Sequence, residues 1–234
     1  AVQVNYIAKG VIAGFQEYID AKMPSPYCLN DVKENALVRG IWTWSRGGGW
    51  GGPYLKNEFW VELNAYVLSQ WAKHRDLSER EIFARFARTK GLPESEIETF
   101  HELCVLSLDG VIKGQYSTLG NTWVNWTRDN KCFEENQLSY MRDIIKSGSQ
   151  KAYGKEKQEA VNVWKKIVKL SHRLHFSDPE LNTYVQNSCQ YALLKYTFFA
   201  DAWKLTMAQL ENESKGILNL KPLQQQVNTS WKNW

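Results

Sequence analysis

The first 55 residues of the chain contain two strand-like runs, which is too few to form a sheet that is covered on both faces. Residues 11–18 form a short apolar run that ends in polar residues, as a buried strand of a parallel sheet does. Residues 38–44 are β-branched and aromatic, and residues 29–37 between the two runs favour a short helix. A βαβ unit needs neighbours to bury both of its faces. The sequence therefore predicts that this segment belongs to a larger sheet.

A glycine-rich loop and then a series of helical patterns follow the second strand-like run. Residues 46–52 contain five glycines, which cost too much backbone entropy to lie within a helix or strand. From residue 57 onward apolar residues recur at helical spacing, and Ser78 with Glu81 forms the pattern of a capping box. The predicted helices cover residues 59–71, 79–90, 93–110, 135–146, 155–174 and 180–211. The tail beyond Gly216 is polar and loosely patterned.

The predicted fold class is therefore mainly α. Residues 1–75 are interpreted as the last two βα units of a (β/α)8 barrel, and residues 76–234 as an appended α-helical domain. The alternative is that the two strands are edge elements of a self-sufficient helical domain. Residues 1–4 carry no Met, basic segment or apolar signal core, as expected when processing or truncation has set the first residue.

Charge and hydropathy exclude several classes of partner. The 29 basic and 25 acidic residues give a net charge of +4 and are spread along the chain, so no basic stripe for nucleic acid is predicted. No apolar stretch approaches the roughly 20 residues that a membrane-spanning helix needs. The glycine run lacks the residues of a phosphate-binding loop, so no nucleotide cofactor is predicted. The sequence thus predicts no nucleic acid, no membrane and no cofactor.

Cysteines and histidines give no metal-site pattern. The cysteines are too far apart in the sequence for a zinc or redox motif, and we interpret most of them as small buried hydrophobic residues: Cys28, Cys104, Cys132 and Cys189. His172 and His175 are three residues apart, but no carboxylate spacing of a zinc-protease helix accompanies them. We expect the histidines to be surface residues, and no metal is predicted.

Four fragments in order resemble the end of the alpha-glucuronidase-like glycoside hydrolases. They are Phe15-Gln16-Glu17-Tyr18 at a strand end, the strand Gly40-Ile41-Trp42-Thr43-Trp44, the glycine and tryptophan loop, and Asn57 to Trp71 followed by Asp76-Leu77-Ser78-Glu79-Arg80-Glu81-Ile82. In that family a Gln-Glu-Tyr closes the seventh barrel strand, and a helix after the eighth leads into a helical C-terminal domain. The resemblance covers residues 10–90. The loop differs, because residues 46–52 replace an Asn- and Asp-bearing loop of the family.

Glu17 is the candidate catalytic residue. Glycoside hydrolysis generally uses two carboxyl groups, and barrel enzymes place such groups at the carboxyl ends of strands. Glu17 is the only acid at the end of either predicted strand, and the resemblance implies that it acts as the general base. The alternative is a structural carboxylate bonded to an arginine or to backbone amides. The general acid would come from an earlier strand, so the isolated chain is predicted to be inactive.

Other acidic residues near Glu17 and the predicted loop are interpreted as solvated. Asp20 follows the strand end before a proline-rich turn, and Glu58 and Glu62 form an i, i+4 pair on one helix face. The substrate-binding candidates are Trp44, Arg46, Trp50, Tyr18 and Asn57.

The binding candidates differ in their chemistry. Arg46 could clamp a uronic-acid carboxylate with two parallel hydrogen bonds, or it could pair with Glu17 or Asp20 instead. Trp44 and Trp50 could form the floor of a sugar subsite, since an indole offers a flat apolar face. Structural roles are favoured for Tyr18 and Asn57, and Trp42 is interpreted as a core residue.

Three hypotheses of function follow from the sequence. The first is the C-terminal portion of a secreted or periplasmic glycoside hydrolase that degrades a uronic-acid-bearing plant or algal polysaccharide, with a carbohydrate substrate as its partner. The second is a non-catalytic helical module that binds carbohydrate or forms a homodimer through the helical domain. The third is a helical polysaccharide lyase, which would need a Tyr and a His facing a basic cleft, and no sequence feature places such a pair.

Overall fold

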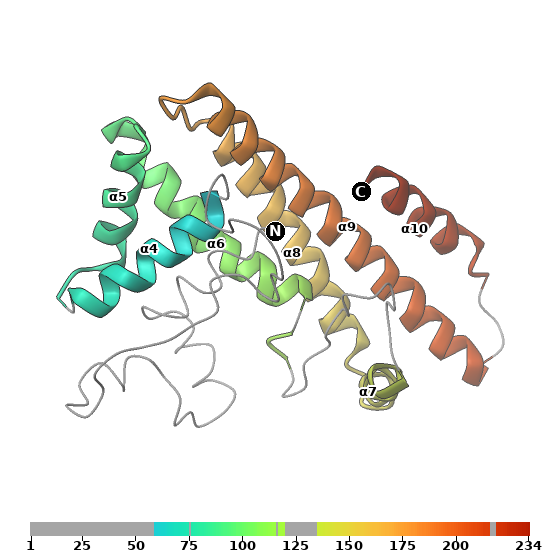
Figure 1. The fold of residues 1–234 in the computed structure, drawn as a ribbon. Coiled ribbons are helices and arrows are strands. Elements are labelled where there is room, and N and C mark those ends of the chain that lie inside the picture. Colours follow the sequence, from blue (N-terminus) through green and yellow to red (C-terminus); the bar gives the residue numbers. More distant parts are fainter. Residues whose placement is uncertain (1–58, 75, 116, 120–134, 216–218) are drawn as a thin grey trace, which may run out of the picture. The chain divides into compact units, whose positions relative to one another are not determined.

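The computed structural model describes residues 59–74, 76–115, 117–119, 135–215 and 219–234 (Figure 1). Within these ranges the chain is mainly α-helical and contains no strand, which confirms the mainly α expectation for this part. The strand-like runs at residues 11–18 and 38–44 lie outside the described residues. The elements are α4 (Phe59–Lys73), α5 (Glu79–Thr89), the 3-10 turn η1 (Glu94–Glu96), α6 (Ile97–Gln115), α7 (Glu135–Lys146), α8 (Gln150–Ser171), α9 (Pro179–Lys215) and α10 (Lys221–Asn233).

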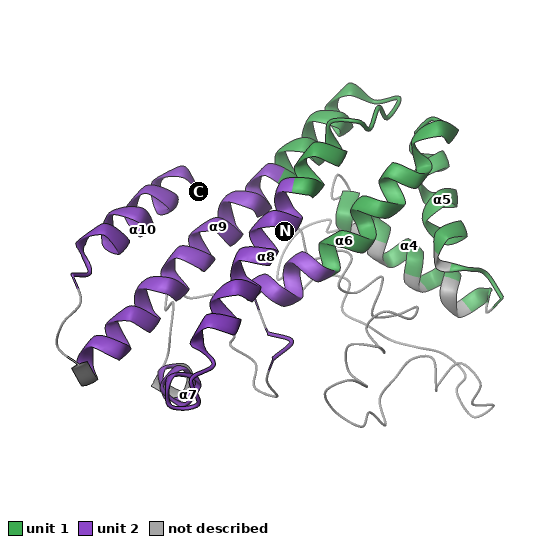
Figure 2. Cartoon of the chain, turned by 180° about the vertical axis from the view of Figure 1, so that it is seen from behind, with its two compact units in different colours: residues 1–108, 166–189 green, residues 109–165, 190–234 purple. Residues whose placement is uncertain are grey.

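The described residues divide into two compact units (Figure 2). Unit 1 comprises α4, α5, η1, the first part of α6 to Leu108, and residues 166–189. Unit 2 comprises the rest of α6 from Asp109, together with α7, α8 to Lys165, α9 from Gln190, and α10. None of the helices in the described ranges is long and apolar enough to cross a membrane.

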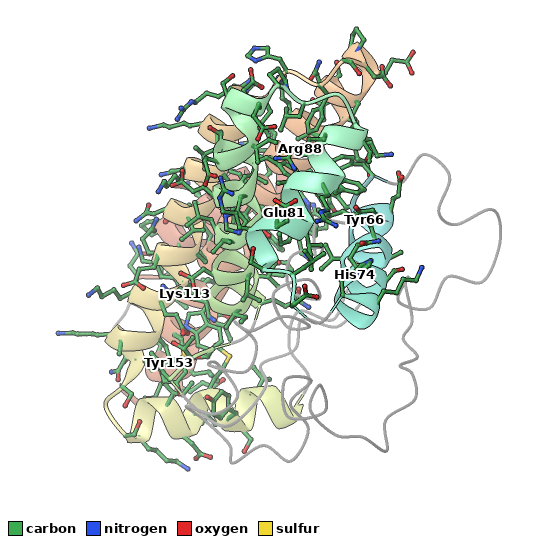
Figure 3. All side chains as sticks on the ribbon, turned by 90° about the vertical axis from the view of Figure 1, so that its left-hand side faces the viewer. Tyr66, His74, Glu81, Arg88, Lys113 and Tyr153 are labelled. Carbon is green, nitrogen blue, oxygen red and sulfur yellow. The ribbon has the colours of Figure 1, made fainter. Side chains whose placement is uncertain are left out.

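The ends of α5 follow from local signals that the sequence already contains. The hydroxyl of Ser78 accepts a hydrogen bond from the backbone N–H of Glu81 at 3.2 Å, so the N-terminus has its predicted cap. The carboxylate of Glu81 accepts from Arg85 at 2.9 Å, and Figure 3 shows Glu81 and Arg88 on this helix. The helix ends at Thr89, and Gly91 has a φ of +71°, a left-handed conformation that favours glycine. This helix is confirmed as predicted.

An aromatic cluster forms much of the core of unit 1. Phe59 lies at the start of α4. The distances from its ring centroid to the ring centroids of Phe86, Phe100 and Phe176 are 5.4, 6.2 and 5.5 Å. These pairs are tilted or edge-to-face, which is the favoured geometry for phenyl rings. Phe59 and Phe100 are buried, as the helical spacing predicts. The cluster therefore joins α4, α5, α6 and the segment before α9.

Helix α6 continues beyond the predicted end at Gly110 and runs to Gln115. The reason lies in unit 2, where Gly110 faces the buried indole of Trp164. A Cβ added at Gly110 would lie 2.5 Å from Nε1 of Trp164, and one at Gly114 would collide with the ring of Tyr196. Both glycines lie inside α6 and allow it to pack closely against Trp164 of α8 and Tyr196 of α9, so the prediction that Gly110 ends the helix was wrong.

The core of unit 2 is built on stacked aromatic rings. Trp164 and Tyr196 lie 5.3 Å apart with nearly parallel planes, and Tyr153 stacks on Trp203 at 6.1 Å. Met141 of α7 is buried in the same cluster as Tyr153 and Trp203. Helix α7 has its predicted bounds. Helix α8 starts at Gln150, five residues before the predicted start at residue 155. Gly154 therefore lies inside the helix, at a position where an added Cβ would meet nothing within 4 Å.

Helix α9 extends further than the sequence analysis predicts, and α10 lies in a tail for which no helix was predicted. Asp178 caps α9 by accepting from the N–H of Glu180 at 2.9 Å, and the helix continues to Lys215. Beyond it, the tail interpreted as loosely patterned forms α10, with Pro222 in its first turn. Ser230 of α10 is buried, and Trp231 and Trp234 contact Phe198 of α9. Helix α10 was missed because its packing residues are few and its exposed residues are amides and lysines.

Candidate functional site

The residues predicted to catalyse and to bind substrate lie outside the described residues. They are Glu17, Tyr18, Trp44, Arg46, Trp50 and Asn57, and the discounted Asp20, Trp42 and Glu58 lie outside them too. Their roles stay predictions. Glu62 lies within the described residues, and it lines a pocket in unit 1.

The unit 1 pocket has a volume of about 470 Å³ and lies where the start of α4, the end of α5 and the start of α9 meet. This volume is typical of pockets that hold small ligands. The wall carries the hydroxyl groups of Thr89, Ser177 and Tyr184 and the apolar side chains of Phe59 and Leu181. The pocket therefore offers both hydrogen-bonding groups and apolar surface to a ligand.

An ion pair between Glu62 and Lys90 forms one side of the pocket. The ammonium of Lys90 donates to both carboxylate oxygens of Glu62, at 2.6 Å each. The Glu62 side chain is 44% exposed and that of Lys90 is 24% exposed, so the pair is partly shielded from water. The Glu62 side chain is thus open to solvent in part, as expected, but it also forms an ion pair with Lys90, the residue after α5, which the sequence analysis did not predict. The negative charge of Glu62 therefore balances the positive charge of Lys90.

Two further carboxylates give the other side of this pocket an acidic character. Asp178 and Glu180 at the start of α9 line it, and both are exposed. The segment before α9 lies close to the end of α5, where Ser177 packs against Gly91. A Cβ at position 91 would collide with the side chain of Ser177. Carboxylates and hydroxyls accept hydrogen bonds, so the pocket suits a ligand rich in hydroxyl or amine donors.

A second pocket of about 460 Å³ lies in unit 2, lined by residues of α8, α9 and α10. Its polar groups are amides, carboxylates and two ammonium groups: Gln150, Lys151, Gln158, Asp201, Lys204, Glu211 and Gln226. The amide of Gln226 donates to Asp201 at 2.6 Å, and that of Gln150 donates to Glu211 at 2.8 Å. The carbonyl oxygen of Gln150 is buried and accepts no hydrogen bond from the described residues.

The carboxyl group of Asp201 is the perturbed acid of this second pocket. Burial raises the pKa of Asp201, while hydrogen bonds from Ser230 and Gln226 act in the opposite direction. Its partners are side chains of α10, so the charge of Asp201 helps hold α10 on α9. We interpret this pocket as a polar site whose side chains hold neighbouring helices together by hydrogen bonds. We see no pair of groups among its described residues that is placed for acid and base catalysis.

The most deeply buried charges of unit 2 are Glu156 and Lys157 of α8. Their side chains are 4% and 3% exposed, and the ammonium lies 3.5 Å from the carboxylate. Lys157 donates to the backbone carbonyl of Lys113 at 2.7 Å, and Glu156 accepts from both the N–H and the hydroxyl of Thr118 at 2.6 Å. Burial lowers the pKa of Lys157 to about 8, against the raising effect of Glu156. These hydrogen bonds assign the pair a structural role.

The described residues contain no group of three or more histidines, cysteines or acids that could hold a metal ion. Cys104 and Cys189 are buried and form no disulfide within the described residues, as expected of small hydrophobic residues, and Cys28 and Cys132 lie outside the described residues. Burial raises the pKa of the Cys189 thiol to about 12, so this thiol is unsuited to act as a nucleophile. His74, His172 and His175 are exposed as predicted, whereas His101 is half-buried.

No protein-family model, no curated protein and no solved structure matches this chain. Sequence reasoning missed both pockets for the same reason. Glu62 and Lys90 carry helical and capping signals, and nothing in their local sequence indicates that they meet. Only the pairing of distant helices brings such residues together.

Proposed function

We propose that this chain is the C-terminal portion of a glycoside hydrolase that acts on a uronic-acid-bearing polysaccharide or oligosaccharide. The observation that carries the proposal is the order of four fragments between residues 10 and 90 that resemble the end of the alpha-glucuronidase-like enzymes. Each fragment is weak alone, whereas their order and spacing together favour this family. A polysaccharide substrate places the parent protein outside the cytoplasm, either secreted or periplasmic.

The described helices agree with the secondary structure that the sequence predicts for the last fragment of the resemblance. The apolar spacing and the capping box of this chain predict a helix over residues 59–71, a break before Ser78, and a second helix from residue 79. The structure has α4 to Lys73, the Asp76-Leu77-Ser78 break, and α5 from Glu79. The segment that carries the last fragment of the resemblance is therefore helical, and the family assignment itself rests on the four sequence fragments.

In the proposed reaction Glu17 acts as the general base, and an acid from an earlier barrel strand protonates the leaving oxygen. Arg46 would bind the carboxylate of the uronic acid, and Trp44 and Trp50 would pack against sugar faces. Tyr18 and Asn57 would line the same site. Because the general acid belongs to another part of the barrel, the chain alone should bind saccharide without cleaving it.

The test uses the full-length protein that contains this chain and glucuronate-bearing oligosaccharides as substrate. The substitution Glu17→Gln should lower kcat by about 10²- to 10⁴-fold, the usual contribution of a general acid or base. Asp20→Asn is the matched control, since it removes a nearby carboxylate that has no proposed role and should leave kcat unchanged. Full activity of Glu17→Gln, or no cleavage by the wild-type protein, would contradict the proposal.

A further inference from the structure

Helices α9 and α10 form an aromatic surface in unit 2, where the two helices run side by side (Figure 2). We call it the aromatic platform and define it by Tyr191, Phe198, Trp231 and Trp234. The ring of Trp234 lies 6.1 Å from Tyr191, 5.3 Å from Phe198 and 5.4 Å from Trp231. Trp231 also lies 5.1 Å from Phe198. The four rings therefore form one continuous cluster.

The outer rings of the platform are open to solvent although they are large and apolar. Trp231 is 55% exposed and Tyr191 is 43% exposed, whereas Phe198 beneath them is 5% exposed. Packing against Phe198 holds the exposed indole of Trp231 in place, so little conformational entropy would be lost when a ligand binds. A preordered, exposed aromatic surface is a feature of binding sites.

The helices that build the platform also carry exposed polar and cationic side chains. Gln224 and Asn228 of α10 are exposed and precede Trp231 by seven and three residues, which places them on the same stripe of the helix. Lys221 and Lys232 of α10 are exposed, and the ammonium of Lys195 of α9 lies over the rings of Tyr196 and Phe199. One acid, Asp201 of α9, accepts a hydrogen bond from Gln226 of α10 at 2.6 Å. Residues 190–201 and 221–234 therefore combine exposed aromatic rings and amides with three lysines and one aspartate.

We propose that the aromatic platform is a saccharide-binding surface that takes an acidic, uronate-bearing oligosaccharide chain. This inference rests on the proposed function for the class of ligand, and it adds a binding surface made of residues other than the predicted site residues. The rings of Trp231 and Tyr191 pack against the C–H faces of sugar rings. The amides of Gln224 and Asn228 exchange hydrogen bonds with hydroxyl groups, and the lysines attract the uronate carboxylates.

A second copy of the chain fits this surface less well. In a two-fold contact α10 would face its own copy, and the helix carries two lysines and no acid, so like charges would meet. A stable protein interface also needs a well-packed area of about 800 Å² from each partner. The exposed part of the platform is limited to two large side chains, which suits a short stretch of saccharide.

The experiment measures binding to the full-length protein in its Glu17→Gln form, so that no substrate is consumed. The probes are a glucuronate-bearing oligosaccharide, the same oligosaccharide with its carboxyl groups reduced, and a single-stranded oligonucleotide of similar charge, each titrated by calorimetry. Trp231→Ala should weaken binding of the acidic oligosaccharide at one class of sites by about tenfold, as expected for the loss of one aromatic anchor. The double substitution Gln224→Ala/Asn228→Ala changes only exposed side chains and should also weaken it.

Leu119→Ala is the matched control, because Leu119 is another exposed apolar residue of unit 2, at 45% exposure, and it lies outside the platform. The control should bind as the parent protein does. Equal binding by Trp231→Ala and the parent would overturn the proposal, as would tighter binding of the oligonucleotide than of the oligosaccharide. A dimer that dissociates on Trp231→Ala substitution, without any effect on saccharide binding, would assign the platform to self-association and also overturn it.

The proposal and the proposed function fail in different ways. If the wild-type protein cleaves no glucuronate-bearing substrate but Trp231→Ala still loses binding, the platform stands and the hydrolase assignment falls. If Glu17→Gln abolishes turnover while all platform variants bind normally, the hydrolase assignment stands and the platform falls.

Discussion

Replacing Gly110 by alanine should destabilise the protein, although alanine is the better helix former. Gly110 lies within α6, where Gly→Ala alone stabilises a helix by about 1 kcal/mol. The added Cβ would lie 2.5 Å from Nε1 and 2.8 Å from Cε2 of Trp164, well inside van der Waals contact. Trp164 is fully buried and stacked on Tyr196, so its ring has little room to move away.

The magnitude follows from the balance of these two effects. Overpacking a well-filled core costs about 1–3 kcal/mol, and a contact this short belongs at the upper end. After the gain in helix propensity, Gly110→Ala should be destabilised by about 2 kcal/mol. For a chain of this size that shift lowers Tm by about 4–8 °C.

Gly154→Ala provides the matched control. Gly154 also lies inside a helix, α8, but a Cβ there would meet nothing within 4 Å. The same substitution should therefore stabilise the protein by about 0.5–1 kcal/mol. Urea denaturation followed by circular dichroism at 222 nm would measure both variants.

The packing argument predicts a specific rescue. Nε1 of Trp164 has no hydrogen-bond partner among the described residues, so Trp164→Phe removes the atom closest to the new Cβ without losing a bond. The double variant Gly110→Ala/Trp164→Phe should be more stable than the two single effects predict, by about 1–2 kcal/mol of coupling. If Gly110→Ala and Gly154→Ala had the same free energy of unfolding, the close contact with Trp164 would not determine the effect of the substitution at Gly110. That result would refute the reasoning.

Two other predictions concern a helix cap and a buried charge. Ser78→Ala should cost about 1 kcal/mol in urea denaturation by removing the cap of α5, and an unchanged midpoint would contradict this. The contribution of Lys157 to stability should increase between about pH 8 and pH 10.5, because the unfolded chain still binds the proton that the folded protein has released. The stability of the wild type relative to Lys157→Met should rise by on the order of 3 kcal/mol over this range, and a constant difference would contradict it.

The helices whose ends carry local signals could be predicted from the sequence. The cap at Ser78, the left-handed glycine at position 91 and the capping Asp178 each act on neighbouring residues, so the printed sequence contains the full cause. The apolar spacing of α4 likewise predicts which residues are buried, since Phe59, Leu63 and Val67 all lie in the core.

The errors arose where a distant residue decides the local structure. Gly110 has the low helix propensity of any glycine, and only the indole of Trp164 makes glycine the favoured residue there. Similarly, α10 has few apolar residues of its own, and its burial depends on Phe198 of α9. Neither partner is near in sequence, so periodicity and propensity could not indicate these outcomes.

Glu156 and Lys157 show the same limit for charged residues. Adjacent charges on a helix are usually solvated, yet both of these side chains are buried. The end of α6 explains why, since the last carbonyl groups of a helix lack partners within it and carry partial negative charge. Lys157 donates to one such carbonyl, that of Lys113, while Glu156 binds Thr118 just beyond the helix.

The pair therefore supplies hydrogen bonds at the end of α6, a helix that lies far away in the sequence. Burial of the two charges is tolerated because each of them is hydrogen-bonded. The requirement belongs to α6, whereas the residues that meet it belong to α8. Any sequence-based reading of α8 by itself assigns the two residues to the surface. Their burial, and the pH dependence that follows from it, can be derived only from the contact between the two helices.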